Sequence, residues 1–178
     1  MKRITSPVIR SKAQQVKLAV FDIDGIMTDG SLYLLSDGLE VKQFNTLDGL
    51  GIKLLQRNAI ATAVITGRSS PQVAQRAAAL GIDFVLQGRD DKLQALLEIC
   101  QANGYQLSQC AYIGDDLPDL AAIRAVAFGA TVPNAHSLLL DHCDWCTQRS
   151  GGNGAAREFC EALLDAQGLL ESTYKDYL

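Results

Sequence analysis

The stretch from Lys17 to Gly30, KLAVFDIDGIMTDG, constrains this chain more than any other part of the sequence. A short apolar run bounded by turn residues is typical of a strand buried on both faces of a sheet. This run ends at Asp22, and Asp24 and Gly25 follow it. In a parallel α/β sheet, ligands bind outside the carboxyl ends of the strands. The sequence therefore predicts that Asp22 is held at a rigid strand end, facing a cleft.

The two aspartates indicate a divalent cation. Carboxylates this close repel each other and are costly to bury without a positive charge nearby. Mg²⁺ is a hard cation that takes carboxylate and carbonyl oxygens as ligands. For Asp-x-Asp considered alone, a strand end with two solvated aspartates is an equally good interpretation, and the rest of the chain must decide between the two.

Apolar runs of strand length alternate with helical patterns along the rest of the chain. After the first strand, further strands are expected at residues 61–66, 84–86, 110–113, 126–129 and 145–147. Helices are expected from residue 48 onward, with Asp48 as its N-cap, and then at 71–80, 90–102, 118–123, 136–140 and 155–167. This alternation predicts an α/β fold with a doubly wound parallel sheet.

A hairpin is expected between the first two strands of this sheet. Two short runs, 31–35 and 39–44, flank Ser36-Asp37-Gly38, and the glycine supplies the positive φ that such a turn needs. Because the hairpin follows the Asp22 turn directly, it is placed to project over the cleft as a flap.

The length of 178 residues predicts a single domain with a substantial core. Residues 1–15 lack periodicity and are expected to be irregular. The domain is expected over residues 16–168, followed by a C-terminal tail, 169–178.

Charge and composition exclude several classes of function. The net charge is −4 and there is no basic run, which argues against binding of nucleic acid or of an anionic membrane surface. There is no apolar segment of membrane-spanning length and no secretory signal. The five cysteines are therefore expected to be free thiols in the cytoplasm. Cys143 and Cys146 have a zinc-like spacing, but no second pair exists and a structural role is favoured.

Polar residues follow three of the expected strands, and together they suit hydrolysis of a phosphate monoester. A carboxylate such as Asp22 can attack phosphorus, and Asp24 can protonate the leaving alcohol and later activate water. Asp115 is the natural further ligand for Mg²⁺, together with Asp22 and the Asp24 backbone carbonyl. Three groups are candidates for binding the phosphate: the Thr66 hydroxyl, the Gly67 N–H and the Lys92 ammonium.

These elements resemble the four motifs of the haloacid dehalogenase superfamily of phosphohydrolases. The motifs are Asp22-Ile23-Asp24-Gly25, Thr66-Gly67-Arg68, Lys92, and Gly114-Asp115-Asp116-Leu117-Pro118-Asp119. The resemblance implies that Asp22 is the nucleophile, that Asp24 is the general acid/base, and that Asp22, Asp24 and Asp115 hold Mg²⁺. It also implies supporting roles for Asp116 and Asp119, with Asp116 orienting Lys92 or a water on the metal.

The spacing of the motifs resembles the branch of that superfamily that lacks a large cap domain. From Lys17 to Gly168 the chain is similar, more narrowly, to the phosphatases of 3-deoxy-D-manno-octulosonate 8-phosphate (Kdo 8-phosphate). That family produces Kdo for lipopolysaccharide. It assembles as a homotetramer in which a neighbouring subunit helps to close each site.

By the same resemblance, the substrate would contact Asn45, Asp48, Gly49 and Arg68. Arg68 suits the carboxylate of the sugar acid, because a guanidinium can pair with it through two hydrogen bonds. The loop 151–154 would either lie over a partner's site or serve as a plain connector.

Two other functions remain open from the sequence. One is a phosphatase for a nine-carbon 2-keto sugar-acid 9-phosphate, such as that of KDN or sialic acid. The other is a catalytically silent structural subunit, which the complete set of catalytic residue types disfavours.

Overall fold

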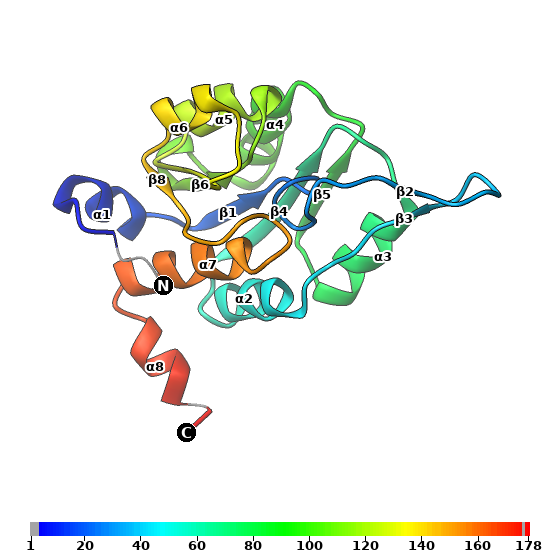
Figure 1. Cartoon of the computed structure of the whole chain (residues 1–178). Helices are drawn as coiled ribbons and strands as arrows, with labels where there is room; N and C mark the ends of the chain where they lie inside the picture. The colour runs from blue at the N-terminus through cyan, green and yellow to red at the C-terminus, as the bar shows by residue number, and fades with distance from the viewer. Residues whose placement is uncertain (1–3, 176) are drawn as a thin grey trace.

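The computed structural model describes residues 4–175 and 177–178 and shows a six-stranded parallel sheet (Figure 1). The strands, in the order in which they lie in the sheet, are β5 (Phe84–Gln87), β4 (Ala61–Thr66), β1 (Leu18–Phe21), β6 (Cys110–Ile113), β7 (Phe128–Thr131) and β8 (Trp145–Cys146). The chain moves outward from β1 to one edge and then returns to build the other edge from β6. This doubly wound α/β topology confirms the fold class predicted from the sequence.

Helices cover both faces of the sheet (Figure 1). One layer contains α1 (Pro7–Gln14), α2 (Thr46–Arg57), α3 (Pro71–Leu80) and α7 (Ala155–Ala166), and the other contains α4 (Lys92–Asn103), α5 (Leu120–Ala125) and α6 (Ser137–His142). Side chains of β1 alternate between the layers: Phe21 packs with the first and Val20 with the second.

The central strand β1 is completely enclosed. All four of its side chains have no solvent exposure, and Phe21 packs edge-on against Phe159 of α7 with ring centroids 5.5 Å apart. Burying each large apolar side chain contributes about 1.5–3 kcal/mol. The strand is paired along its length to β4 and β6. Asp22 therefore follows one of the most firmly held segments of the molecule.

The predicted hairpin is present, with strands shorter than expected. It consists of β2 (Tyr33–Leu34) and β3 (Glu40–Val41), and it projects from the body of the molecule (Figure 1). Asp37 accepts a hydrogen bond from the Leu39 N–H at 3.0 Å, and Gly38 has a φ of 81°. Apart from the hairpin and α2, the chain between Asp24 and β4 forms no regular element, so there is no large cap domain here.

The N-terminal segment differs from the expectation. Within the segment 1–15, predicted as irregular, residues 7–14 form α1, because the Ser6 side chain caps the helix and Pro7 occupies its first position. Residues 1–3 lie outside the described part. In the C-terminal tail, residues 170–175 form α8 (Leu170–Lys175), which packs on α7. In the parts that the structure describes, no helix combines the length and apolar character needed to span a bilayer.

The start of α2 also differs from the prediction. The N-cap is Asn45, whose side chain accepts a hydrogen bond from the Leu47 N–H at 2.9 Å. Asp48, predicted as this cap, is the third residue of the helix and lies in its first turn, and its side chain caps a different helix, as described below.

Candidate active site

A cavity of about 410 Å³ opens at the carboxyl ends of β1, β4 and β6. It lies where the strand order reverses, between β1 and β6, which is the usual ligand position in such sheets. Its lining is formed by Asp22, Asp24, Thr66, Gly67, Arg68, Asp90, Lys92, Asp115, Asp116, Pro118 and Asp119. All the side chains predicted to do chemistry therefore meet in one place.

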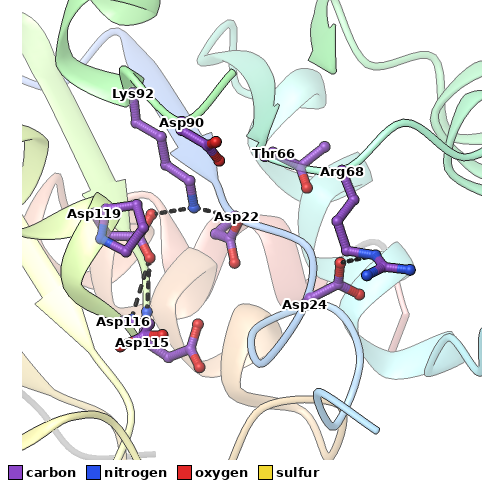
Figure 2. Close-up of a pocket in the computed structure, with 11 residues that line it drawn as sticks. Asp22, Asp24, Thr66, Arg68, Asp90, Lys92, Asp115, Asp116 and Asp119 are labelled. Atoms are coloured by element: carbon purple, nitrogen blue, oxygen red, sulfur yellow. Dashed lines mark hydrogen bonds and ion pairs between the residues drawn. The ribbon is translucent and has the colours of Figure 1, made fainter. Parts of the chain in front are cut away.

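Lys92 joins two aspartates from different parts of the chain (Figure 2). Its ammonium lies 2.7 Å from Asp22 Oδ1 and 2.6 Å from Asp119 Oδ1. All three side chains are almost fully buried, so solvent screens these contacts weakly. Lys92 is the first residue of α4, and the helix therefore delivers the charge to the end of β1.

The Asp119 carboxylate is fully occupied by protein donors. Besides Lys92, it accepts hydrogen bonds from the Tyr112 hydroxyl at 2.8 Å and from the backbone N–H groups of Asp115 and Asp116, each at 3.2 Å. A Cβ on Gly114 would lie 2.3 Å from Asp119 Cγ, so the turn needs glycine at this position.

The resemblance implies that Asp116 orients either Lys92 or a water on the metal, and in this structure the carboxylate that contacts Lys92 is that of Asp119. Asp116 is exposed, and its side chain accepts from the Leu117 N–H at 2.8 Å, which starts the short 3-10 helix η2 (Leu117–Asp119). Because this cap turns Asp116 outward, Asp119 is the side chain of the motif that reaches the buried ammonium.

Burial and excess negative charge raise the pKa values of two carboxyls. Burial and the charge of Asp119 raise the pKa of Asp22 to about 8, against the lowering effect of Lys92. The same two causes raise the pKa of Asp115 to about 7. Burial alone would lower the pKa of Lys92, but Asp22 and Asp119 more than compensate and raise it. Asp22, Asp115 and Asp119 thus lie near a single ammonium, and this part of the site has an excess of negative charge.

The donor set fits a divalent cation. Carboxylate oxygens of Asp22, Asp115 and Asp119 lie within 4.8 Å of one another. Asp115 Oδ1 is buried and has no hydrogen-bond partner among the residues that the structure describes, whereas each oxygen of Asp119 accepts two hydrogen bonds. Oxygen ligands of this kind are those that Mg²⁺ takes. Asp22 and Asp115 are therefore the carboxylates best suited to hold the ion.

Gly25 makes room for this arrangement. A Cβ at this position would lie 2.1 Å from Asp115 Oδ2, and the residue has a φ of 99°, which side chains rarely adopt. The glycine after the two aspartates thus lets the turn after β1 pass directly beneath the Asp115 carboxylate.

Asp24 faces the other side of the cavity and meets residues from the hairpin. The Lys42 ammonium contacts Asp24 Oδ1, and Arg68 Nε lies 3.9 Å from Asp24 Oδ2 (Figure 2). Glu40 connects the two cations, 3.0 Å from Lys42 Nζ and 2.5 Å from Arg68 Nη2. Sequence reasoning missed Glu40 and Lys42; their positions two apart in a strand of the expected flap were the available signal.

Thr66 and Gly67 lie where β4 ends, and both line the cavity, as predicted. Thr66 is only 2% exposed. A Cβ on Gly67 would lie 2.4 Å from Asp90 Oδ1, so Asp90 approaches the backbone there closely. Asp90 was expected only as the start of a helix, and its place in the cavity lining was not predicted.

Three of the four predicted substrate residues lie outside the cavity lining, and Arg68 is the one inside it. Asp48 is buried and accepts from the Arg157 N–H at 2.8 Å, in the first turn of α7. Gly49 packs against α3, where a Cβ would lie 2.4 Å from Arg76 Nη2. Asn45 donates from its side chain to the Gly152 carbonyl at 3.0 Å.

The loop 151–154 packs against this chain's own turn after β1. The Gly152 N–H donates to the Ile26 carbonyl at 2.9 Å, and a Cβ on Gly151 would lie 1.7 Å from the Gly25 carbonyl oxygen. The loop therefore supports the turn that carries Asp24.

Comparison of the sequence with known proteins identifies relatives that are phosphatases. A family model for haloacid dehalogenase-like hydrolases matches residues 84–159. The 3-deoxy-D-manno-octulosonate 8-phosphate phosphatase KdsC of Salmonella typhimurium is 39% identical over 93% of this chain and 88% of its own length. The protein of the same name from Yersinia pestis is 42% identical over 90% of this chain and 86% of its own length.

Solved structures give the same result. A 3-deoxy-D-manno-octulosonate 8-phosphate phosphatase from Moraxella catarrhalis, in complex with magnesium, phosphate and KDO, superposes with a TM-score of 0.94; it is 46% identical and the match covers 96% of this chain and 98% of that one. A cobalt-bound phosphatase from Haemophilus influenzae superposes with a TM-score of 0.86, at 37% identity, over 89% and 93% of the two chains. The chain therefore belongs to the haloacid dehalogenase-like hydrolases, in the family of the 3-deoxy-D-manno-octulosonate 8-phosphate phosphatases, and is a phosphoric monoester hydrolase.

Proposed function

We propose that this protein hydrolyses Kdo 8-phosphate to Kdo and phosphate, with Mg²⁺ as its cofactor and an aspartyl phosphate as intermediate. The observation that carries the proposal is the meeting of Asp22, Asp115 and Lys92 at the end of β1, with an unpartnered oxygen on Asp115. The relatives named for this activity, and the one solved with magnesium, phosphate and KDO, support the choice of substrate and ion.

Asp22, Asp115 and the Asp24 backbone carbonyl are the groups that would hold the ion. When bound, Mg²⁺ supplies positive charge that draws the nucleophile and the phosphate together. Lys92 adds a second positive charge beside Asp22. The Thr66 hydroxyl and the Gly67 N–H would donate hydrogen bonds to phosphate oxygens.

In the first step, an Asp22 carboxylate oxygen attacks phosphorus and the bond to the C8 oxygen breaks. Asp24 donates its proton to that leaving oxygen. In the second step, Asp24 takes a proton from a water molecule as the water attacks phosphorus, which releases phosphate and restores Asp22. The two roles need Asp22 to reach phosphorus and Asp24 to reach the leaving oxygen, and both carboxylates line the same cavity.

Phosphate release from Kdo 8-phosphate tests the proposal. We expect turnover with Mg²⁺, none after treatment with EDTA, and none in Asp22→Asn, which keeps the size of the side chain. We expect much slower release from a nine-carbon sugar-acid 9-phosphate, and faster release would instead identify that ester as the substrate. Turnover of no sugar-acid phosphate would favour the structural-subunit alternative.

We also propose that the chain works as a cytoplasmic homotetramer in lipopolysaccharide synthesis, with sites closed by neighbouring subunits. Exposed apolar side chains on the hairpin, such as Leu34 at 70% exposure, support burial in an assembly. Analytical ultracentrifugation tests the assembly, and a monomer with full activity would contradict shared sites.

A further inference from the structure

Glu40, on the hairpin strand β3, is paired with the guanidinium of Arg68, the group that the family resemblance assigns to the substrate carboxylate. Its Oε2 lies 2.5 Å from Arg68 Nη2. Arg68 lines the cavity and is half-exposed, so a ligand can reach the same guanidinium from the cavity. A carboxylate of the protein thus sits where a carboxylate of the ligand would pair.

The surroundings hold Glu40 in place as an anion. Hydrogen bonds from Lys42 and Arg68 lower the pKa of Glu40 below its usual range, so it is ionised at neutral pH. Its backbone carbonyl accepts from Gln72 Nε2 at 2.7 Å, which ties β3 to the first turn of α3. Since Arg68 lies just before that helix, the two partners approach each other from fixed positions.

The same contacts let Glu40 leave Arg68 without becoming an isolated charge. Its other oxygen lies 3.0 Å from the Lys42 ammonium, which is almost fully buried and also contacts Asp24. An incoming carboxylate can therefore take over Arg68 while Glu40 keeps Lys42. A neutral group lacks the charge to displace Glu40 from the guanidinium.

We propose that Glu40 is a specificity-determining residue, an internal carboxylate that competes with the substrate carboxylate for Arg68. This inference rests on the proposed function, because it takes Kdo 8-phosphate, a sugar-acid phosphate, as the substrate and Arg68 as the group that pairs with its carboxylate. Its consequence is that Glu40 lowers the affinity for phosphate esters that carry a carboxylate and leaves other esters largely unaffected.

Two small esters of nearly equal size test the competition, because 3-phosphoglycerate carries a carboxylate where glycerol 3-phosphate carries a hydroxymethyl group. In Glu40→Gln, we expect the ratio of kcat/KM for 3-phosphoglycerate to that for glycerol 3-phosphate to rise about fivefold, through KM, as suits a half-exposed ion pair. The same rise through KM is expected for Kdo 8-phosphate.

Asp37→Asn is the matched control, because it removes the same charge from the same hairpin at an exposed turn. Asn can still accept the Leu39 N–H. The ratio should stay at the wild-type value in this control. In Arg68→Gln, adding Glu40→Gln should no longer change the ratio.

An unchanged or lower ratio in Glu40→Gln would overturn the proposal, as would an equal rise in both variants. Failure to hydrolyse Kdo 8-phosphate alone would reject the proposed function, and the ratio for the two small esters would still decide the role of Glu40.

Discussion

Asp119 and Lys92 form a buried ion pair, 2.6 Å between Oδ1 and Nζ, that links the turn after β6 to the start of α4. Because Lys92 also contacts Asp22, Asp119 sets the position of the charge beside the proposed nucleophile. Removing one partner of such a pair leaves donors unsatisfied, which gives a first prediction.

Asp119→Ala should lower the free energy of unfolding by about 3 kcal/mol, because it removes the acceptor of a buried ammonium and of two backbone N–H groups. Tyr112→Phe is the matched control, since it removes one hydrogen bond to the same carboxylate and should cost about 1 kcal/mol. Urea unfolding measures both. Equal losses would show that the ion pair contributes nothing beyond a single hydrogen bond.

Asp24→Asn should separate the two chemical steps. With p-nitrophenyl phosphate, the leaving group needs no proton, so we expect a burst of p-nitrophenolate equal to the enzyme concentration. Steady-state turnover should then fall by about 10²–10⁴, because no base activates the water. Stopped-flow absorbance measures both phases. A lower rate without a burst would place Asp24 outside the second step.

The raised pKa values of Asp22 and Asp115 predict how stability depends on pH. The folded protein holds protons on these groups up to about pH 7–8, whereas the unfolded chain releases them near pH 4. The folded state therefore binds more protons in this range, and the stability contribution of these protons is lost as the pH rises.

Without metal, Asp22→Asn should gain in Tm relative to the wild type as the pH is raised from 5 to 8. Mg²⁺ should raise the Tm of the wild type more at pH 8 than at pH 5, since the ion competes with these protons. Calorimetry with and without Mg²⁺ measures both trends. A stabilisation by Mg²⁺ that did not change with pH would contradict the assignment of Asp22 and Asp115 as ligands.

Gly25→Ala should abolish the effect of Mg²⁺ on Tm, because the new Cβ would lie 2.1 Å from Asp115 Oδ2. Gly38→Ala is the control for backbone strain, since Gly38 has a positive φ of 81° and an added Cβ would meet no atom of the described residues within 4 Å. The control should cost about 1 kcal/mol of stability and keep the response to Mg²⁺. If both variants kept that response, the close approach of Gly25 to Asp115 would have no part in the site.

Asp48→Ala decides between a role in substrate binding and a role in helix capping. Asp48 accepts from the Arg157 N–H at the start of α7 and lies outside the cavity lining. We expect a loss of about 1–2 kcal/mol in stability, as for other capping residues, and a KM close to that of the wild type. A large rise in KM without a loss of stability would show that Asp48 binds the substrate and does not act as a helix cap.

The sequence predicted the site residues whose position depends only on the strand that they follow. Asp22, Thr66 and Asp115 follow buried strands, and parallel strands bring such ends to one edge, so their meeting follows from the topology. The choice of Asp119 over Asp116 did not follow from spacing, because it depends on which side chain caps η2.

Contacts between segments far apart in the sequence could not be predicted from the residue pattern. Asp48 fits the N-terminal turn of α2, and only the arrival of α7 from the far end of the chain shows that its carboxylate serves Arg157. Glu40 and Lys42 were given no role from the sequence, because their contacts depend on the hairpin folding back toward Asp24 and Arg68. The helix at residues 7–14 was missed because the segment lacks apolar periodicity, and the Ser6 cap followed by Pro7 was the signal for a helix start.

The cavity lies at the carboxyl ends of the parallel strands, and the turns at their amino ends lie on the opposite side of the sheet. The turns that precede β5 and β6 contain Gly81 and Gly104, and an added Cβ at either would meet nothing within 4 Å in the part of the chain that the structure describes. Affinity tags, fluorophores or inserted domains attached at these two turns would therefore stand a full strand length away from the cavity, which makes them the natural handles for immobilising or labelling a working enzyme.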